Sequence, residues 1–211
     1  MGNAYTLVIG DKRYSSWSLR PWLLMRQAGI GFDETMVKLR QPTTRAELLK
    51  QSAAGLVPVL KHGDLTVWDS LAIAEYLNER HPQARLWPAD ASARAIARSV
   101  AAEMHSSFRE LRYGLPMDFT GSALAPEINE QCAADIGRVV QVWRDTRAKY
   151  GSGGPFLFGA FSVADAMYAP VVSRFSSYIV ALADYGDDGS AEAYRAMMMG
   201  LPPMIDWGLA A

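Results

Sequence analysis

Cysteine is almost absent from this sequence, which has only Cys132 among 211 residues. A single cysteine excludes an intramolecular disulfide and fits a reducing compartment. The chain also lacks a long apolar run, because no stretch approaches the roughly 20 residues that a membrane-spanning helix needs. Its first residues lack the basic region and the apolar core of a secretory signal. We therefore expect a cytoplasmic protein that has no membrane contact.

An excess of charge of either sign is missing as well. Lys and Arg number 21 against 22 for Asp and Glu, which gives a formal net charge of −1. This balance excludes the electrostatic footprint of a protein that binds nucleic acid or an anionic membrane surface. The spacing of the 3 histidines does not indicate a metal site, so we expect no bound metal.

The first third of the chain alternates strand and helix patterns. Tyr5 to Ile9 is rich in β-branched and aromatic residues, as strands are, and Trp17 to Ala28 has a helical pattern. The patterns that follow predict a strand over Phe32 to Leu39, a short helix opened by a capping box at Thr44 to Glu47, a hairpin over 57–68, and a helix over 70–80 capped by Asp69. The predicted order of elements is β-α-β-α-β-β-α.

Pro21 limits where the first helix can begin. Proline is harmless only in the first helical turn, whose amides have no partner within the helix. We therefore expect the N-cap of this helix among Ser15, Ser16 and Ser18.

The rest of the chain has helical patterns only. Residues 83–89 have the composition of a linker. Beyond them we predict one long helix over Asp90 to Leu115, a second from Pro126 to about Tyr150, a third capped by Ser162 with Asp165 as its capping-box partner, and a fourth over Ala191 to Met199. The sequence therefore predicts an α/β domain over residues 1–82 and an all-α domain over residues 90–211.

Four motifs follow one another along these elements. They are Ser15-Ser-Trp-Ser-Leu-Arg20, Leu56-Val-Pro-Val-Leu60, the pair Asp69-Ser70, and Ser162-x-x-Asp165. In this order they resemble the cytosolic glutathione transferase family over nearly the whole chain, and the first is similar to the serine motif of the zeta and tau classes. The resemblance implies a thioredoxin-like N-terminal domain, a C-terminal helical bundle, glutathione as co-substrate and a homodimer.

In that family, the serine of the first motif contacts the glutathione sulfur, and Ser15 has the matching spacing to Arg20. A hydroxyl at a helix N-terminus can donate a charge-assisted hydrogen bond to a thiolate, and the positive end of the helix dipole adds to it. Ser16 is the nearby alternative for this catalytic role. The simpler interpretation is that these serines only cap the helix. No thiol is present in the motif, so we expect no disulfide exchange there.

The resemblance also implies how glutathione is held. Pro58 would follow a cis peptide bond that turns the backbone of Val57 toward the cysteinyl unit of glutathione. Asp69 and Ser70, at a helix start, would bind the γ-glutamyl end. The glycyl carboxylate would meet a cation, for which Arg40, Arg45 and Lys50 are the candidates and Arg40 is the residue we assign.

The second substrate, a small electrophile, would bind between the two domains. Trp17, Phe108, Leu111 and Arg112 are the candidates for its pocket, although residues of these types at helical spacing are more often core. Trp17 stands where the zeta class usually has cysteine, so the zeta substrate does not follow from the resemblance.

The sequence thus favours a glutathione transferase that conjugates the glutathione thiolate to a small electrophile. Two alternatives stay open. One is a zeta-like cis–trans isomerase for maleylacetoacetate-type substrates, in which glutathione is not consumed. The other is a binding or scaffold protein of the same fold without catalysis.

Overall fold

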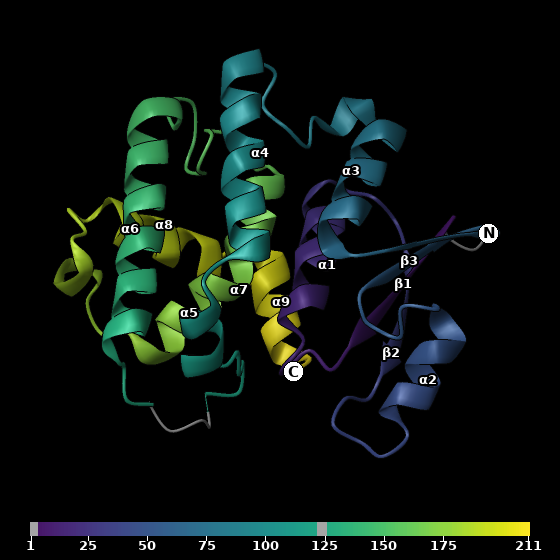
Figure 1. The fold of residues 1–211 in the computed structure, drawn as a ribbon. Coiled ribbons are helices and arrows are strands. Elements are labelled where there is room, and N and C mark those ends of the chain that lie inside the picture. Colours follow the sequence, from purple (N-terminus) through teal and green to yellow (C-terminus); the bar gives the residue numbers. More distant parts are fainter. Residues whose placement is uncertain (1–3, 122–125) are drawn as a thin grey trace.

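The computed structural model describes residues 4–121 and 126–211 of the chain. Its elements, labelled in Figure 1 except for β4, are β1 (Tyr5–Gly10), α1 (Ser16–Gln27), β2 (Asp33–Val37), α2 (Thr44–Gln51), β3 (Val59–His62), β4 (Leu65–Trp68), α3 (Ser70–Arg80), α4 (Ala91–Ser106), α5 (Arg109–Gly114), α6 (Glu130–Tyr150), α7 (Val163–Tyr178), α8 (Ser190–Met199) and α9 (Pro202–Leu209). Short 3₁₀ turns lie at Pro82–Ala84 and Leu182–Tyr185. All strands of the described residues precede α3, as the sequence predicts.

The sheet has the strand order β2-β1-β3-β4, in which β1 is parallel to β2 and antiparallel to β3. Helices cover both of its faces. Leu7 and Ile9 on β1 belong to the large core that α1 and α3 complete, whereas Val8 on the opposite face packs with Leu48 of α2. Because both faces are buried, the centre of β1, Leu7 to Ile9, is a continuous apolar run. This arrangement confirms the predicted thioredoxin-like half.

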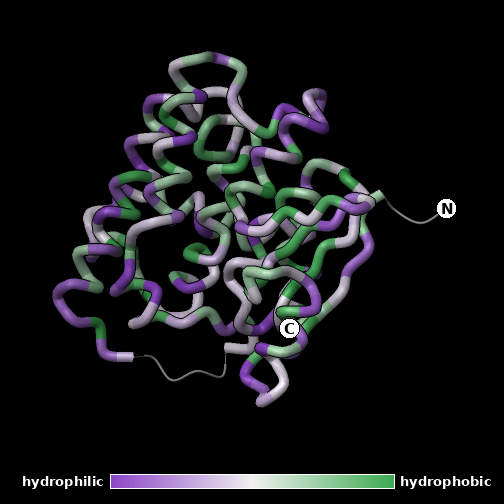
Figure 2. The backbone as a smooth tube through the Cα atoms, turned by 45° about the vertical axis from the view of Figure 1, so that its right-hand side comes forward, coloured by the Kyte–Doolittle hydropathy of each residue, from purple (hydrophilic) through white to green (hydrophobic). Residues whose placement is uncertain are grey.

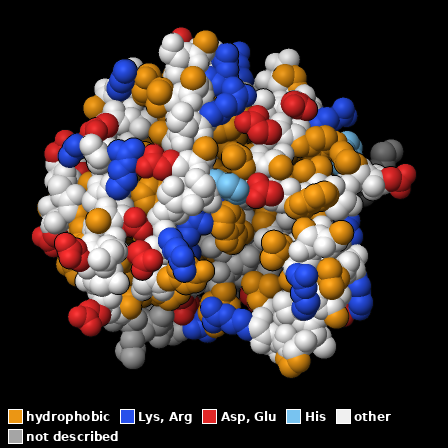
Figure 3. Space-filling view, in the orientation of Figure 1, with side chains coloured by type: hydrophobic (Ala, Val, Ile, Leu, Met, Phe, Trp, Pro, Cys, Tyr) orange, Lys and Arg blue, Asp and Glu red, His pale blue; other side chains and the backbone are white. Residues whose placement is uncertain are grey.

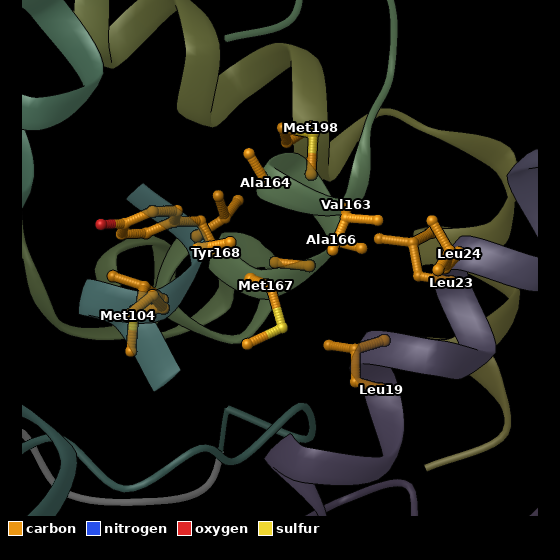
Figure 4. Packing of buried hydrophobic residues seen from close by; sticks show 14 of the residues in the cluster. Leu19, Leu23, Leu24, Met104, Val163, Ala164, Ala166, Met167, Tyr168 and Met198 are labelled. Carbon is orange, nitrogen blue, oxygen red and sulfur yellow. The ribbon is translucent and has the colours of Figure 1, made fainter. Parts of the chain in front are cut away.

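The helical half is organised around α7, which is buried along Val163–Phe175. Figure 4 shows Leu19 and Leu23 of α1 facing the side of α7 that carries Val163 and Met167, so one apolar core runs from the sheet half into the helical half. In Figure 2 the hydrophobic segments lie toward the interior and the hydrophilic ones toward the outside. Among the described residues, none of the helices is both long enough and apolar enough to cross a membrane.

The capping predictions made near residues 69 and 162 are confirmed. Asp69 Oδ1 accepts hydrogen bonds from the amides of Leu71 and Ala72 at the start of α3. At the start of α7, Ser162 and Asp165 form the reciprocal capping box. The division into domains at residues 83–89 stays a prediction; residues 1–3 and 122–125 of the two predicted domains lie outside the described part.

The predicted helix over Asp90 to Leu115 is wrong, because the chain breaks into α4 and α5. Phe108 has a φ of 60°, which no α-helix accommodates, and its side chain is only 5% exposed. Burial of this ring in the core accompanies the break. The helix predicted from Pro126 begins later, at Glu130, because the side chain of Asn129 caps it by accepting from the amide of Cys132.

The capping box predicted at Thr44 is also wrong. The N-cap of α2 is Thr43, and the Thr44 hydroxyl instead donates to the carbonyl of Lys38 and accepts from the amide of Gln41. Glu47 pairs with a lysine one turn later in the same helix. The side chains that looked like a reciprocal cap are therefore occupied by contacts to the preceding loop and to the helix itself.

Pro21 lies deeper in α1 than the sequence argument allowed. The N-cap is Ser15, one of the three serines expected, but Pro21 is then the sixth residue of the helix rather than part of its first turn. Proline at this position cannot donate to the carbonyl of Trp17. Burial of Pro21 against the core outweighs the lost hydrogen bond.

Candidate functional site

The N-terminus of α1 carries the serines of the first motif. Ser15 is 5% exposed, and its hydroxyl lies 2.7 Å from the hydroxyl oxygen of Ser18, which is fully buried. The amide of Gly10 donates to the same Ser18 oxygen over 3.1 Å. A Cβ at position 10 would come within 2.6 Å of the Leu39 side chain and 3.0 Å of Ser15 Oγ, so glycine leaves room for both. Ser15 and Ser18 therefore form a small polar centre beneath the first turn of α1.

A first cavity of about 340 Å³ lies beside this helix start. It is lined by Trp17, Leu56, Val57, Pro58, Trp68, Asp69 and Ser70, and the Val57–Pro58 peptide bond is cis. The cavity thus unites residues from the first three sequence motifs, which stand on α1, on the loop before β3 and at the start of α3.

Asp69 is held rigidly in this cavity. Its backbone has a φ of 76°, and its Oδ1 accepts from the first amides of α3 at 2.8 and 3.2 Å. Its Oδ2 lies 3.2 Å from Nε2 of His105, a residue of α4. One carboxylate oxygen therefore caps the helix, and the other faces the seam between the two halves of the molecule. Figure 3 shows histidine, acidic, basic and hydrophobic side chains meeting along this seam.

Arg20 is buried behind Trp17. Its guanidinium carbon lies 4.2 Å from the centre of the Trp17 ring, and one amino group lies 3.5 Å from Ser70 Oγ. Burial, with a contribution from Arg112 and Arg174, lowers the pKa of Arg20 well below its ordinary value, while Asp69 acts in the opposite direction. Arg20 thus places a positive charge behind the start of α3.

A second cavity of about 560 Å³ lies on the other side of Trp17, which lines both. Its walls are Ser16, Trp17, Ser106, Ser107, Arg109, Arg112, Tyr113 and Arg174. Arg174 is only 6% exposed, and burial together with the charge of Arg112 lowers its pKa to about 10. Within the described residues no carboxylate lies at ion-pair distance from any of these arginines.

The structure places most of the predicted site residues along the two cavities, but Ser15, Phe108, Leu111 and Arg40 line neither of them. Phe108 and Leu111, predicted for the electrophile pocket, are buried in the core at 5% and 0% exposure and line neither cavity. Arg40 is exposed and stacks over the Tyr14 ring at 4.0 Å, again outside both cavities. Arg45 and Lys50 are engaged elsewhere, with the Gly55 carbonyl and with a glutamate of α2. In the structure these three cations do not reach the first cavity.

Sequence reasoning also missed residues that the fold places in the site. His105, Arg174 and Trp68 come from α4, α7 and β4, and each lines a cavity or contacts a residue that does. In the sequence, Arg20 was used only to match the spacing of the serine motif and was not assigned to the site. Arg174, which follows a long apolar stretch of α7, was the one signal in the sequence that pointed to a special role.

Comparison with known proteins identifies a family domain in the N-terminal half of the chain. Residues 14–80 match the family described as glutathione S-transferase, N-terminal domain. The match shows a glutathione S-transferase N-terminal domain over these residues. The matched segment contains all residues that line the first cavity.

Curated relatives of this chain include proteins of two kinds. Glutathione S-transferase 1 of Dianthus caryophyllus is 35% identical over 99 residues, which are 46% of this chain and 45% of that protein. Maleylacetoacetate isomerase of Rattus norvegicus is 30% identical over 130 residues, 61% of this chain and 58% of that protein. The chain thus spans about half the length of the curated relatives it matches. A zeta-class relative from Euphorbia esula is consistent with the zeta- and tau-like branch predicted from the serine motif.

Solved structures of the same fold cover nearly the whole chain. A glutathione transferase homolog from Burkholderia gl BGR1 with bound glutathione has a TM-score of 0.70 at 22% identity and covers 96% of this chain and 95% of that one. A tau-class glutathione S-transferase from mango, Mangifera indica, has a TM-score of 0.73 at 21% identity, with 97% and 92% covered. These neighbours confirm the thioredoxin-like domain followed by a helical domain.

Proposed function

We propose that this protein is a glutathione transferase in which Ser15 stabilises the glutathione thiolate for attack on a small electrophile. The observation that carries the proposal is the first cavity. It combines Val57 and Pro58 with Asp69 and Ser70 next to the N-terminus of α1. Glutathione offers three groups that match these elements: a γ-glutamyl ammonium and carboxylate, a cysteinyl backbone, and a thiol.

Each group has a partner with suitable chemistry. The Asp69 carboxylate suits the ammonium, and the positive N-terminal end of α3 at Ser70, with Arg20 behind it, suits the γ-glutamyl carboxylate. The backbone of Val57 can pair with the cysteinyl unit as an added strand does. The thiol would then lie at the start of α1, where the positive end of the helix dipole favours an anion.

A free thiol has a pKa near ~8.5, and the thiolate is the nucleophile. Lowering this pKa by ~2 units requires about 2.7 kcal/mol of selective stabilisation of the anion. The Ser15–Ser18 pair can supply part of it, because hydroxyl protons rotate to suit their partners. In the structure Ser15 Oγ donates to Ser18 Oγ, which also accepts from the Gly10 amide. With a thiolate bound, the Ser15 proton would turn to the sulfur and the Ser18 proton to Ser15.

A cytoplasmic location, a homodimer, and the absence of nucleic-acid, membrane and metal partners belong to the same proposal. They are supported by the sequence and by what is usual in the family. Titration of the protein with glutathione tests the first step of the proposed reaction, which is glutathione binding. Binding with an acidified thiol supports a transferase, whereas binding with an ordinary thiol supports the scaffold alternative.

A second candidate function, a glutathione-dependent isomerase, is favoured by the second cavity. Arg109, Arg112 and Arg174 line it without carboxylate partners in the described part of the chain, where Arg112 and Arg174 donate only to main-chain carbonyls. Their positive charges favour an anionic ligand. Some curated relatives are named maleylacetoacetate isomerases, and the compound in that name is a carboxylate anion. Whether glutathione is consumed in the reaction distinguishes an isomerase from a conjugating enzyme.

The arginines of the second cavity give a testable substrate preference. Arg174→Met is expected to lower kcat/KM roughly tenfold for a carboxylate-bearing electrophile such as 4-chloro-3,5-dinitrobenzoate, because a charge-assisted hydrogen bond to a carboxylate contributes about 1.5–3 kcal/mol. With uncharged 1-chloro-2,4-dinitrobenzene the change should be small. Arg98→Met, outside both cavities, is the matched control. Equal losses with both electrophiles would contradict an anion-binding role for Arg174.

A further inference from the structure

His105 connects the two halves of the molecule at the first cavity. Its Nε2 lies 3.2 Å from Asp69 Oδ2, and its ring packs edge-on against Trp17 at a centroid distance of 5.4 Å. The other ring nitrogen, Nδ1, is buried and has no hydrogen-bond partner among the described residues. A histidine of α4 thus contacts two residues that line the cavity, Asp69 and Trp17.

We propose that His105 is a positioning residue of the glutathione site: it orients Asp69 when neutral, and when protonated it competes with the γ-glutamyl ammonium for Asp69 Oδ2. The proposal rests on the proposed function, because it assumes that Asp69 receives that ammonium. It assigns to His105 a pH-dependent control of glutathione affinity.

The competition follows from the geometry of the carboxylate. Oδ1 of Asp69 already accepts two amide hydrogen bonds, so Oδ2 is the oxygen with free capacity. A neutral imidazole with its proton on Nε2 donates one hydrogen bond to Oδ2 and leaves the second lone pair for the ammonium. A protonated imidazole adds a like charge beside the ammonium, and like charges at such distances repel in a partly buried site.

The groups around His105 keep it neutral at neutral pH. Burial lowers the pKa of His105 from its ordinary value of 6.5, and the positive charges of Arg20 and Arg112 act in the same direction, while Asp69 opposes them. Protonation would also place a proton on Nδ1, which is buried without an acceptor. His105 therefore becomes charged only in mildly acidic solution. The two binding events are linked. If bound glutathione disfavours protonation of His105, then protonation of His105 weakens glutathione binding by the same factor.

The test measures binding of a glutathione analogue without a thiol. Titration calorimetry with γ-glutamyl-2-aminobutyryl-glycine, from about pH 7.5 to about pH 5.5, removes any contribution from thiol ionisation. The Kd of the wild type is expected to rise roughly three- to tenfold over this range, in keeping with the usual size of coupling between two sites. In His105→Gln, whose amide can still donate to Asp69 Oδ2, the Kd should change less than about twofold.

Two controls separate the possible outcomes. His81→Gln, at a histidine that bonds Tyr5 away from the cavity, should keep the wild-type pH dependence. An analogue with glutaryl in place of γ-glutamyl lacks the ammonium and should bind with little dependence on pH. An equal pH dependence in the wild type and in His105→Gln would overturn the role of His105 while leaving the glutathione site intact. No binding of the analogue at pH 7.5 would overturn the proposed function itself.

Discussion

Ser15→Ala is expected to lower kcat/KM for conjugation of glutathione by roughly 10²- to 10³-fold. This is the usual effect of removing one positioned hydrogen-bond donor that stabilises a developing or bound anion. The Ser15 side chain lies at the N-cap of α1, directly over the buried Ser18 hydroxyl. Steady-state kinetics with 1-chloro-2,4-dinitrobenzene measure the loss, which should appear mainly in kcat at pH 6.5.

Ser16→Ala is the matched control for this prediction, since it removes a hydroxyl one residue further along the same helix. Ser15 lines neither cavity but bonds Ser18 at the N-cap of α1, whereas Ser16 lines the second cavity and lacks that bond, so we expect the kcat/KM of Ser16→Ala to stay within about threefold of the wild type. The reverse result, with the large loss in Ser16→Ala, would transfer the thiolate contact to Ser16. Equal small losses in both variants would favour simple helix capping.

Asp165→Ala is expected to lower the free energy of unfolding by about 3–5 kcal/mol, the largest stability effect that we predict. Asp165 is fully buried and accepts four hydrogen bonds, from the amides of Leu157 and Ser162, the Ser162 hydroxyl and the Tyr194 hydroxyl. Burial raises its pKa to about 6, still below neutrality, so at pH 7 it acts as an acceptor only. Its removal leaves all four donors buried without a partner.

Urea unfolding followed by circular dichroism measures this cost. Tyr194→Phe removes only one of the four donors and should cost about 1 kcal/mol. Asp145→Ala, at an exposed position on α6, should change stability by less than about 0.5 kcal/mol. A cost for Asp165→Ala no larger than that of Asp145→Ala would show that the network does not hold the start of α7.

Local chemistry explains why much of the fold could be predicted. Asp69 and Ser162 cap helices with their own side chains, and the apolar run of β1 fits a strand that is buried on both faces. These signals need only neighbours in the sequence. The order of elements along the chain then limited the topology, and the observed sheet order agrees with the predicted thioredoxin-like half.

The errors arose where distant residues decide the local structure. Phe108 interrupts a helical pattern with a left-handed backbone conformation, and Thr44 turns its hydroxyl to the preceding loop. The composition of the site also depends on residues that are far apart in the sequence. His105 and Arg174 lie 36 and 104 residues from Asp69 and Ser70 along the sequence, so only the packing of α4 and α7 on α1 shows that they belong there. Leu111, by contrast, has the right character for a pocket but faces the core.

The measurement that tests the central claim most directly is the ultraviolet absorbance of the bound glutathione thiolate against pH, in the wild type and in Ser15→Ala. The account predicts a bound thiol pKa roughly 2 units below the free value of ~8.5 in the wild type, and a return of at least about one unit toward it in Ser15→Ala. A bound thiol that titrates at the free value in the wild type, or an equal shift in both proteins, would contradict thiolate stabilisation by Ser15.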